Sequence, residues 1–161
     1  MTKNGMIPTF VTYNTLIGGF CRVGIPKTAL ELLHEMQGCD KHPNVQTYVI
    51  LLDSLGKNLQ FPKAITLFQA MVDKKLDLNI VIYNILIDDT RHVGKLKIVR
   101  EFFNSLSTKG FQADVWTYTI MIKGVCKERL LNEVRELFEK IEENGCSPNH
   151  VTYNIIIQGT L

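Results

Sequence analysis

One short stretch of this chain returns at a fixed interval. The segment VTYNTLIGGF at residues 11–20 reappears as VTYNIIIQGT at residues 151–160. Every tyrosine of the chain lies in the same slot of such a segment, 35 residues after the one before it: Tyr13, Tyr48, Tyr83, Tyr118 and Tyr153. A fixed period of this size is typical of repeat proteins, in which each unit packs only against its neighbours.

Each repeat is expected to be a pair of helices. From Val11 to Phe20, apolar residues recur at helical spacing, and Gly24 then breaks the pattern. Pro26 suits the first turn of a second helix, because the N–H that proline lacks would have no partner there. Later first helices are expected at about 45–57, 80–92 and 115–127, and second helices at about 61–74, 95–109 and 130–144.

The period therefore predicts an all-α fold, an α-solenoid of stacked helix-turn-helix repeats. One hairpin cannot bury both of its apolar stripes, whereas stacked neighbours can. A compact helical bundle is the alternative, but a bundle has no need for identical spacings. The expected array has the tail of a preceding repeat at 1–9, whole repeats at 10–44, 45–79, 80–114 and 115–149, and the first helix of a partial fifth repeat at 150–161.

Composition excludes several classes of protein. The 161 residues are 45% hydrophobic, which suffices for a continuous core, and the net charge of +2 neither requires nor excludes a nucleic-acid partner. No apolar run approaches the ~18 residues of a membrane helix, so no membrane partner is expected. The opening residues MTKNGMIPTF have neither the apolar core of a signal peptide nor the composition of a transit peptide, so no targeting peptide is expected within the chain.

Neither a metal site, a cofactor nor an enzyme is expected. The cysteines form no CxxC pair, no histidine lies at ligand spacing from one, and all four are interpreted as buried or half-buried fillers under reducing conditions: Cys21, Cys39, Cys126 and Cys146. No His-x-Glu motif or glycine-rich phosphate loop is present, and no catalytic residue is predicted. The pairs Asp88-Asp89 and Glu142-Glu143 are helix neighbours that point in different directions, so we interpret them as solvated faces.

The repeats resemble pentatricopeptide repeats of the P class. The stretches that carry the likeness are VTYNTLIGGFCRVG followed by ALELLHEM, and WTYTIMIKGVCKE followed by VRELFEKIEENGCSPN. These sequence stretches are most similar to those of the restorer-of-fertility-like branch of plant organellar proteins. This resemblance implies a right-handed superhelix and a mitochondrial or plastid location. It also implies that the chain is a piece of a longer array, whose uncapped ends favour self-association.

The resemblance further implies that the chain binds single-stranded RNA, in organellar RNA processing, stability or translation control. One base is read per repeat, by the residue after the tyrosine together with the last residue of the repeat. The implied base-reading pairs are Asn14 with Asn44, Val49 with Asn79, Asn84 with Asp114, and Thr119 with Asn149, while Asn154 has no second member. From the 5′ side they imply a pyrimidine, a weakly read base, U and A. A helix-capping role is the alternative for Asn44, Asp114 and Asn149, since Asn and Asp are good N-caps.

Two further slots share the expected RNA face. The slot two residues before the tyrosine, whose members sandwich the bases in this family, holds Val11, Gln46, Val81, Trp116 and Val151. Eleven residues later, about three helical turns on, a basic slot expected to contact phosphates holds Arg22, Lys57, His92 and Lys127. The alternatives are a core or inter-repeat role for Trp116 and simple stabilisation of the helix dipole by the basic residues.

Several residues depart from the repeat pattern, most of them in the third repeat. Asp89, Thr90 and Arg91 replace a glycine, an apolar residue and a cysteine, and Leu59 and Arg129 stand where glycine makes the turn in other repeats. We expect the middle of the array to be loosely packed.

Two other classes of function stay open. A peptide-binding scaffold would use the same face as an RNA-binding protein, and a truncated fragment would have no function. The recurring polar pairs favour RNA, because a peptide binder has no reason to keep them.

Overall fold

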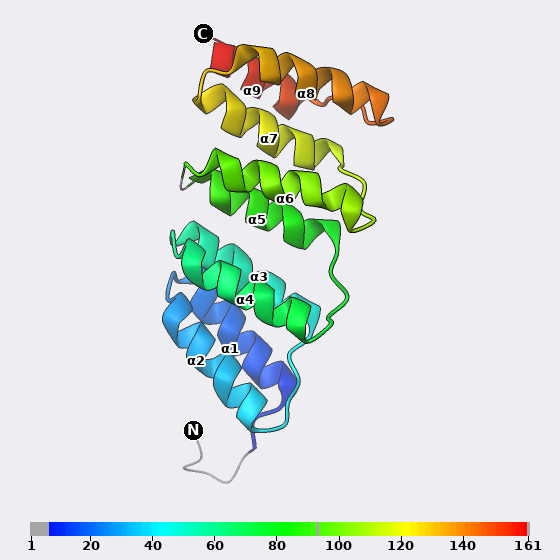
Figure 1. Ribbon diagram of the computed structural model, residues 1–161. Coiled ribbons are helices and arrows are strands. Elements are labelled where there is room, and N and C mark those ends of the chain that lie inside the picture. The colour runs from blue at the N-terminus through cyan, green and yellow to red at the C-terminus, as the bar shows by residue number, and fades with distance from the viewer. Residues whose placement is uncertain (1–6, 93, 161) are drawn as a thin grey trace. The chain divides into compact units, whose positions relative to one another are not determined.

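The computed structural model describes residues 7–92 and 94–160, and these residues form nine α-helices and no strand. The expected all-α fold is therefore confirmed (Figure 1). The first helices are α1 (Phe10–Arg22), α3 (Val45–Lys57), α5 (Ile80–His92), α7 (Val115–Lys127) and α9 (His150–Thr160). The second helices are α2 (Pro26–Gly38), α4 (Phe61–Asp73), α6 (Leu96–Thr108) and α8 (Leu131–Glu143). Among the described helices, none has both the length and the hydropathy that crossing a bilayer requires.

The bounds of the helices follow the sequence pattern closely. Helices α3, α5 and α7 have the expected bounds, and α4, α6 and α8 differ from theirs by at most one residue at either end. Pro26 and Pro62 lie in the first turn of α2 and α4, as the missing N–H of proline favours. The division of the chain into four whole repeats remains a prediction.

The chain divides into two compact units, and the first spans Met1–Leu78. Its two hairpins, α1 with α2 and α3 with α4, pack through α1 on α3 and through α2 on α3. The core between these helices holds Ile17, Leu33, Met36 and Leu51, each at most 2% exposed. Apolar stripes that a lone hairpin would leave in water are thus covered by the next hairpin.

The second unit spans Asn79–Leu161 and repeats this plan with one more helix. The hairpins α5 with α6 and α7 with α8 pack through α5 on α7 and α6 on α7, and α9 packs on α7. Helix α9 approaches α7 so closely that a Cβ atom at Gly159 would lie 2.5 Å from the Cβ of Cys126. Glycine is therefore required at residue 159 by the packing of these two helices.

The tyrosine slot is the centre of each repeat's core. Tyr13, Tyr48, Tyr83 and Tyr118 are at most 4% exposed, whereas Tyr153 on α9 is 48% exposed. Tyr48 accepts hydrogen bonds from Gln37 and from Lys74 at the end of α4, and Tyr118 accepts one from Asn144 at the end of α8. The apolar ring can thus be buried while its hydroxyl ties the first helix to the end of the second.

The hydroxyl of Tyr13 lies in a different polar environment from those of the other tyrosines. It donates to the Glu35 carboxylate at 3.3 Å and lies 3.7 Å from the Cys39 sulfur. The hydrogen bond with Cys39, burial and the nearby Glu35 charge raise the pKa of Tyr13 to about 12. The phenol therefore remains protonated throughout the physiological range of pH.

The cysteines follow the expected filler role only in part. Cys126 is buried and Cys21 and Cys146 are half-buried, but Cys39 is exposed. The expectation that all four would be covered is therefore wrong for Cys39, which directly follows the last residue of α2. Burial raises the pKa of the Cys126 thiol, which disfavours its reactive thiolate form.

Two slots of the repeat adopt left-handed backbone whatever residue occupies them. The turn between the paired helices has positive φ at Gly24 (75°), Leu59 (56°), Gly94 (67°) and Arg129 (57°). The second residue after the second helix has positive φ at Asp40, Lys75, Gly110 and Gly145. Only glycine adopts this conformation without steric cost, so half of these turns are strained.

We predict that Leu59→Gly stabilises the protein. The Leu59 side chain is 65% exposed, so its loss removes little packing, while its positive φ costs about 1 kcal/mol or more. After the entropy that glycine adds to the unfolded chain, the free energy of unfolding should rise by about 0.5 kcal/mol. Chemical denaturation measures this change. Leu59→Ala is the matched control, because it removes the side chain but keeps the Cβ atom; an equal gain in both variants would contradict the explanation.

Candidate nucleic-acid interface

The last residue of each predicted repeat caps the helix that follows it. The side-chain oxygen of each cap accepts a hydrogen bond from the backbone N–H of the third residue after it. The pairs are Asn44 with Thr47 (3.0 Å), Asn79 with Ile82 (3.2 Å), Asp114 with Thr117 (2.7 Å) and Asn149 with Thr152 (3.0 Å). In each case the cap satisfies an N–H that the first turn of a helix leaves without a partner. The capping alternative is therefore confirmed at Asn44, Asp114 and Asn149. Asn79 caps α5 in the same way, which the sequence analysis did not predict, and any role in base reading is additional to these caps.

The residues after the tyrosines differ in how much of their side chain is accessible. Asn14 and Val49 are half-buried and Asn154 is exposed, but Asn84 is only 5% exposed and Thr119 only 2%. The Thr119 hydroxyl also donates to the Val115 carbonyl at 2.6 Å. In the second unit, the predicted base-reading side chains of α5 and α7 are thus largely covered by the protein itself, whereas that of α9 is exposed.

The slot predicted to sandwich the bases is accessible along its length. Val11, Gln46, Val81 and Trp116 are exposed, and Val151 is half-buried. Trp116 is 52% exposed, so the alternative that its ring belongs to a core is wrong. Within each unit, large apolar side chains that remain exposed at this position are suited to contact with flat aromatic ligands.

The basic slot lies at the ends of the first helices. Arg22, Lys57 and Lys127 are exposed, whereas the prediction for His92 falls on a side chain outside those that the structure describes. The Lys57 ammonium pairs with Asp53 at 2.5 Å, and Arg22 donates to the Gly18 carbonyl of its own last turn at 3.4 Å. The helix-dipole alternative therefore holds for Arg22, although its charge stays in contact with solvent.

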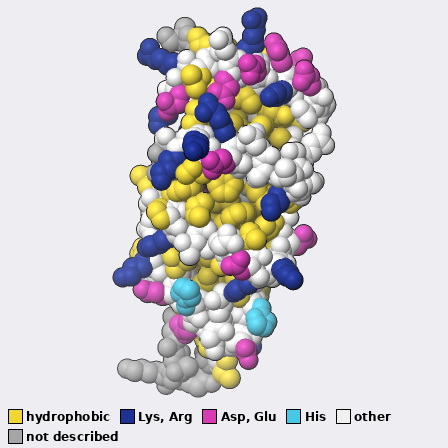
Figure 2. Space-filling model, in the orientation of Figure 1, with side chains coloured by type: hydrophobic (Ala, Val, Ile, Leu, Met, Phe, Trp, Pro, Cys, Tyr) yellow, Lys and Arg dark blue, Asp and Glu magenta, His cyan; other side chains and the backbone are white. Residues whose placement is uncertain are grey.

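A basic cavity adjoins Lys127 in the second unit. It has a volume of about 560 Å³ and is lined by four cationic side chains, those of Arg91, Lys123, Lys127 and Arg129. Such a concentration of positive charge favours binding of an anion. Elsewhere, the face of the protein seen in Figure 2 has lysine and arginine interspersed with acidic and apolar side chains.

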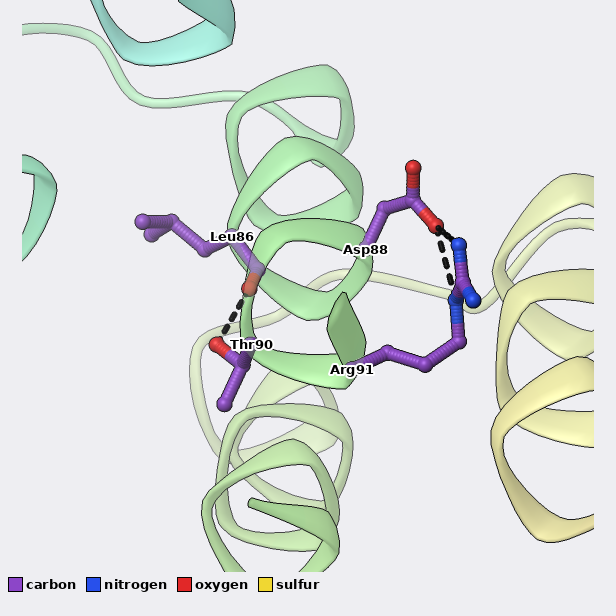
Figure 3. Close-up of polar contacts among 4 residues, drawn as sticks. All are labelled: Leu86, Asp88, Thr90 and Arg91. Atoms are coloured by element: carbon purple, nitrogen blue, oxygen red, sulfur yellow. Dashed lines mark hydrogen bonds and ion pairs between the residues drawn. The ribbon is translucent and has the colours of Figure 1, made fainter. Parts of the chain in front are cut away.

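Thr90 and Arg91, two of the polar residues of the third repeat, have partners close by, and Asp89 is only 8% exposed, so its interpretation as part of a solvated face is wrong. The Thr90 hydroxyl donates to the Leu86 carbonyl at 2.5 Å, and the Arg91 guanidinium donates to Asp88 Oδ1 from Nε at 2.9 Å and from a terminal nitrogen at 2.6 Å (Figure 3). These contacts avoid most of the cost that a buried hydroxyl or guanidinium would otherwise have. Arg91 takes the place of a cysteine and so brings a cation to the basic cavity.

Comparison with known protein families accounts for this recurring arrangement. A profile described as PPR repeat family matches residues 8–57, one described as PPR repeat matches 46–76, and one described as pentatricopeptide repeat domain matches 102–160. The chain contains pentatricopeptide repeats.

The chain spans a fifth or less of the length of two curated relatives that it matches. A mitochondrial pentatricopeptide repeat-containing protein of Arabidopsis thaliana is 30% identical over 51% of the chain and 20% of its own length. A chloroplastic one from the same plant is 35% identical over 50% of the chain and 10% of its own length. The crystal structure of the pentatricopeptide repeat protein PPR10 in complex with an 18-nt psaJ RNA element is 26% identical, with a TM-score of 0.86 over 98% of the chain and 23% of PPR10.

The structure of these pentatricopeptide repeats adds residues that sequence reasoning missed. Thr47, Thr117 and Thr152 precede tyrosines directly, and each hydroxyl contacts a residue 33 positions earlier in the chain. The signal was present in the repeated motif TY, which has threonine before four of the five tyrosines. The spacing alone could not show it, because the contact joins the first helices of two successive repeats.

We predict that Asn44→Ala lowers the free energy of unfolding by about 1 kcal/mol, because the first turn of α3 loses its cap. Asn44→Asp keeps a side-chain acceptor and should remain close to the original stability. Urea denaturation followed by circular dichroism measures both changes. Equal stability of the alanine variant would mean that water replaces the cap, and the last residues would then be free of a structural role.

Proposed function

We propose that this chain binds single-stranded RNA through the first helices of its pentatricopeptide repeats, with one base read per repeat. The proposal is carried by the likeness to RNA-bound PPR10, which at 26% identity and a TM-score of 0.86 extends over 98% of the chain. It is supported by three slots of suitable chemistry in register: polar base-reading pairs, an exposed sandwich slot and exposed cations. Because the chain spans under a quarter of PPR10, the activity of the whole protein is also part of the proposal.

In each base-reading pair, we propose that the residue after the tyrosine contacts the base and that the last residue of the repeat positions it. In the third repeat, the Asn84 amide donates to Asp114 and accepts from Thr117. One N–H and one lone pair of the amide then remain for a base. With Asn84 only 5% exposed, a base would meet this amide edge-on. From the order of the pairs, we propose a target RNA that carries, from the 5′ side, a pyrimidine, a weakly read base, U and A.

Stacking and charge would supply most of the affinity. Exposed Trp116 offers a ring on which a base can stack, a contact that contributes about 1–3 kcal/mol. Lys127 and the cations around the basic cavity would contact phosphates, so binding should weaken with salt. A peptide ligand would use the stacking surface but would have no need of the polar pairs.

We infer that this protein acts in an organelle, in RNA processing, stability or translation control. Its relatives in Arabidopsis thaliana include proteins named as mitochondrial and as chloroplastic. The sequence resemblance to the P class and its restorer-of-fertility-like branch favours the mitochondrion. The location of a fluorescent fusion of the protein in plant cells, in mitochondria or in chloroplasts, would decide between the two organelles.

We predict that the purified chain prefers a short RNA carrying pyrimidine-pyrimidine-U-A over the same RNA with G and C in place of U and A. Fluorescence anisotropy of the labelled RNAs measures the two dissociation constants. Asn84→Ala should reduce the preference about tenfold, since a base-specific hydrogen bond contributes about 1 kcal/mol or more. Val49→Ala is the matched control, because Val49 has no side-chain hydrogen bond to lose. Equal binding of both RNAs by the unmodified chain would contradict sequence reading.

We predict that Trp116→Ala weakens binding of every RNA by about tenfold while leaving the order of preference unchanged. The physical reason is that stacking does not depend on the identity of the base and contributes about 1–3 kcal/mol. Val81→Ala, in the same slot of the third repeat, should have a much smaller effect because valine offers no ring. A tryptophan whose fluorescence did not respond to RNA would contradict stacking at this position.

A further inference from the structure

A threonine hydroxyl joins the two members of a base-reading pair in three separate places. Thr47 Oγ lies 2.7 Å from Asn14 Oδ1 and 2.9 Å from Asn44 Oδ1. Thr117 Oγ lies 2.8 Å from Asn84 Oδ1 and 2.7 Å from Asp114 Oδ1. The threonine belongs in each case to the helix that follows the pair, so one repeat contributes to the base-reading site of the repeat before it.

The third example has the same geometry with a different residue after the tyrosine. Thr152 Oγ lies 2.8 Å from Thr119 Oγ and 3.2 Å from Asn149 Oδ1. The three bridging threonines, Thr47, Thr117 and Thr152, are at most 1% exposed. Water therefore cannot readily replace these hydroxyls, and hydrogen bonds in such surroundings are stronger than at the surface.

We propose that Thr117 is a positioning residue which, together with Asp114, holds the Asn84 amide in one orientation and thereby lets the third repeat distinguish uracil from cytosine. Thr47 and Thr152 occupy the same place for the Asn14–Asn44 and Thr119–Asn149 pairs. This inference rests on the proposed function, because it concerns how a base-reading side chain is oriented.

The orientation of an asparagine amide decides what it offers to a base. The carbonyl end only accepts and the NH₂ end only donates, so turning the amide over exchanges the two. Uracil presents an acceptor at its O4 atom where cytosine presents an N4 amino donor. An amide free to turn could match either base, whereas an amide held in one orientation matches only one.

The two asparagine pairs are held to different degrees. Asn84 is fixed at both ends, since its Oδ1 faces the Thr117 hydroxyl at 2.8 Å and its NH₂ donates to Asp114 Oδ1 at 3.3 Å. For Asn14 the described contact is at one end, from the Thr47 hydroxyl. Asp114 is an acceptor on both oxygens when ionised, so it favours the NH₂ end of Asn84 on its side. This difference explains why the third repeat would select uracil and the first would accept either pyrimidine.

The test replaces the hydroxyl without changing the size of the side chain. In Thr117→Val, the ratio of dissociation constants for RNAs with C and with U at the third base should fall by about fivefold to tenfold, as expected for one hydrogen bond. The preference at the fourth base, read by the helix that carries Thr117 itself, should stay unchanged. Thr117→Ser keeps the hydroxyl and should restore the original ratio.

The control separates base selection from helix capping. Thr12 has the same place in α1 and makes the same cap contacts with Thr9, its backbone N–H and its Oγ each lying 3.2 Å from their partners. Thr12→Val, at an exposed cap, should lower thermal stability less than Thr117→Val and leave the ratio at the third base unchanged. If Thr117→Val lowers stability and keeps the ratio, the threonine is only a cap and the inference is overturned.

Two further outcomes are distinguishable. Absence of any base preference in the unmodified chain would contradict the proposed function itself, before the role of Thr117 arises. If circular dichroism shows that Thr117→Val does not fold, Thr152→Val provides the same test one repeat later. It should reduce the preference for A over G at the fourth base by about fivefold and leave the third base unaffected. An unchanged preference at the fourth base would overturn the inference.

Discussion

The described helices of this protein are too short to be stable alone, and every other feature depends on how neighbouring hairpins cover them. Eight of the helices have 13 residues. Isolated helices of about 12–15 residues are marginal in water even when their sequences favour helix. Their stability must therefore come from tertiary burial, and the tyrosine slot supplies it by placing a ring in the core of each hairpin and a hydroxyl at the end of the second helix. The period of 35 residues follows from this repeated requirement.

The same packing brings the ends of neighbouring repeats together. The last residue of one predicted repeat caps the first helix of the next, and a threonine in that helix reaches back to the residue after the preceding tyrosine. Capping, stacking of helices and orientation of the polar side chains are therefore linked at one place. A substitution at such a place changes stability as well as binding, which is why the proposed experiments compare ratios of affinities and matched caps.

Residues that depart from the repeat pattern show what the fold requires and what it tolerates. Leu59 and Arg129 adopt the same left-handed backbone as Gly24 and Gly94, so the geometry of the turn is imposed by the two helices that it joins. Thr90 and Arg91 replace apolar and small residues of other repeats and find polar partners within α5. At Gly159 no such accommodation is available, because the chain of α7 lies within contact distance of the missing side chain.

The sequence by itself determined the all-α fold, the bounds of the helices and the slots that line the proposed RNA face. These properties depend on local spacing and on the chemistry of single residues, such as proline in the first turn of α2 or asparagine before α3. Only the tertiary structure decided that Asn84 and Thr119 are nearly covered, that Trp116 is exposed, that Cys39 lies outside the core and that threonines bridge the polar pairs. Exposure and side-chain partners depend on groups about 33 residues away, and a pattern along the chain does not specify which atoms of two stacked helices come within hydrogen-bond distance.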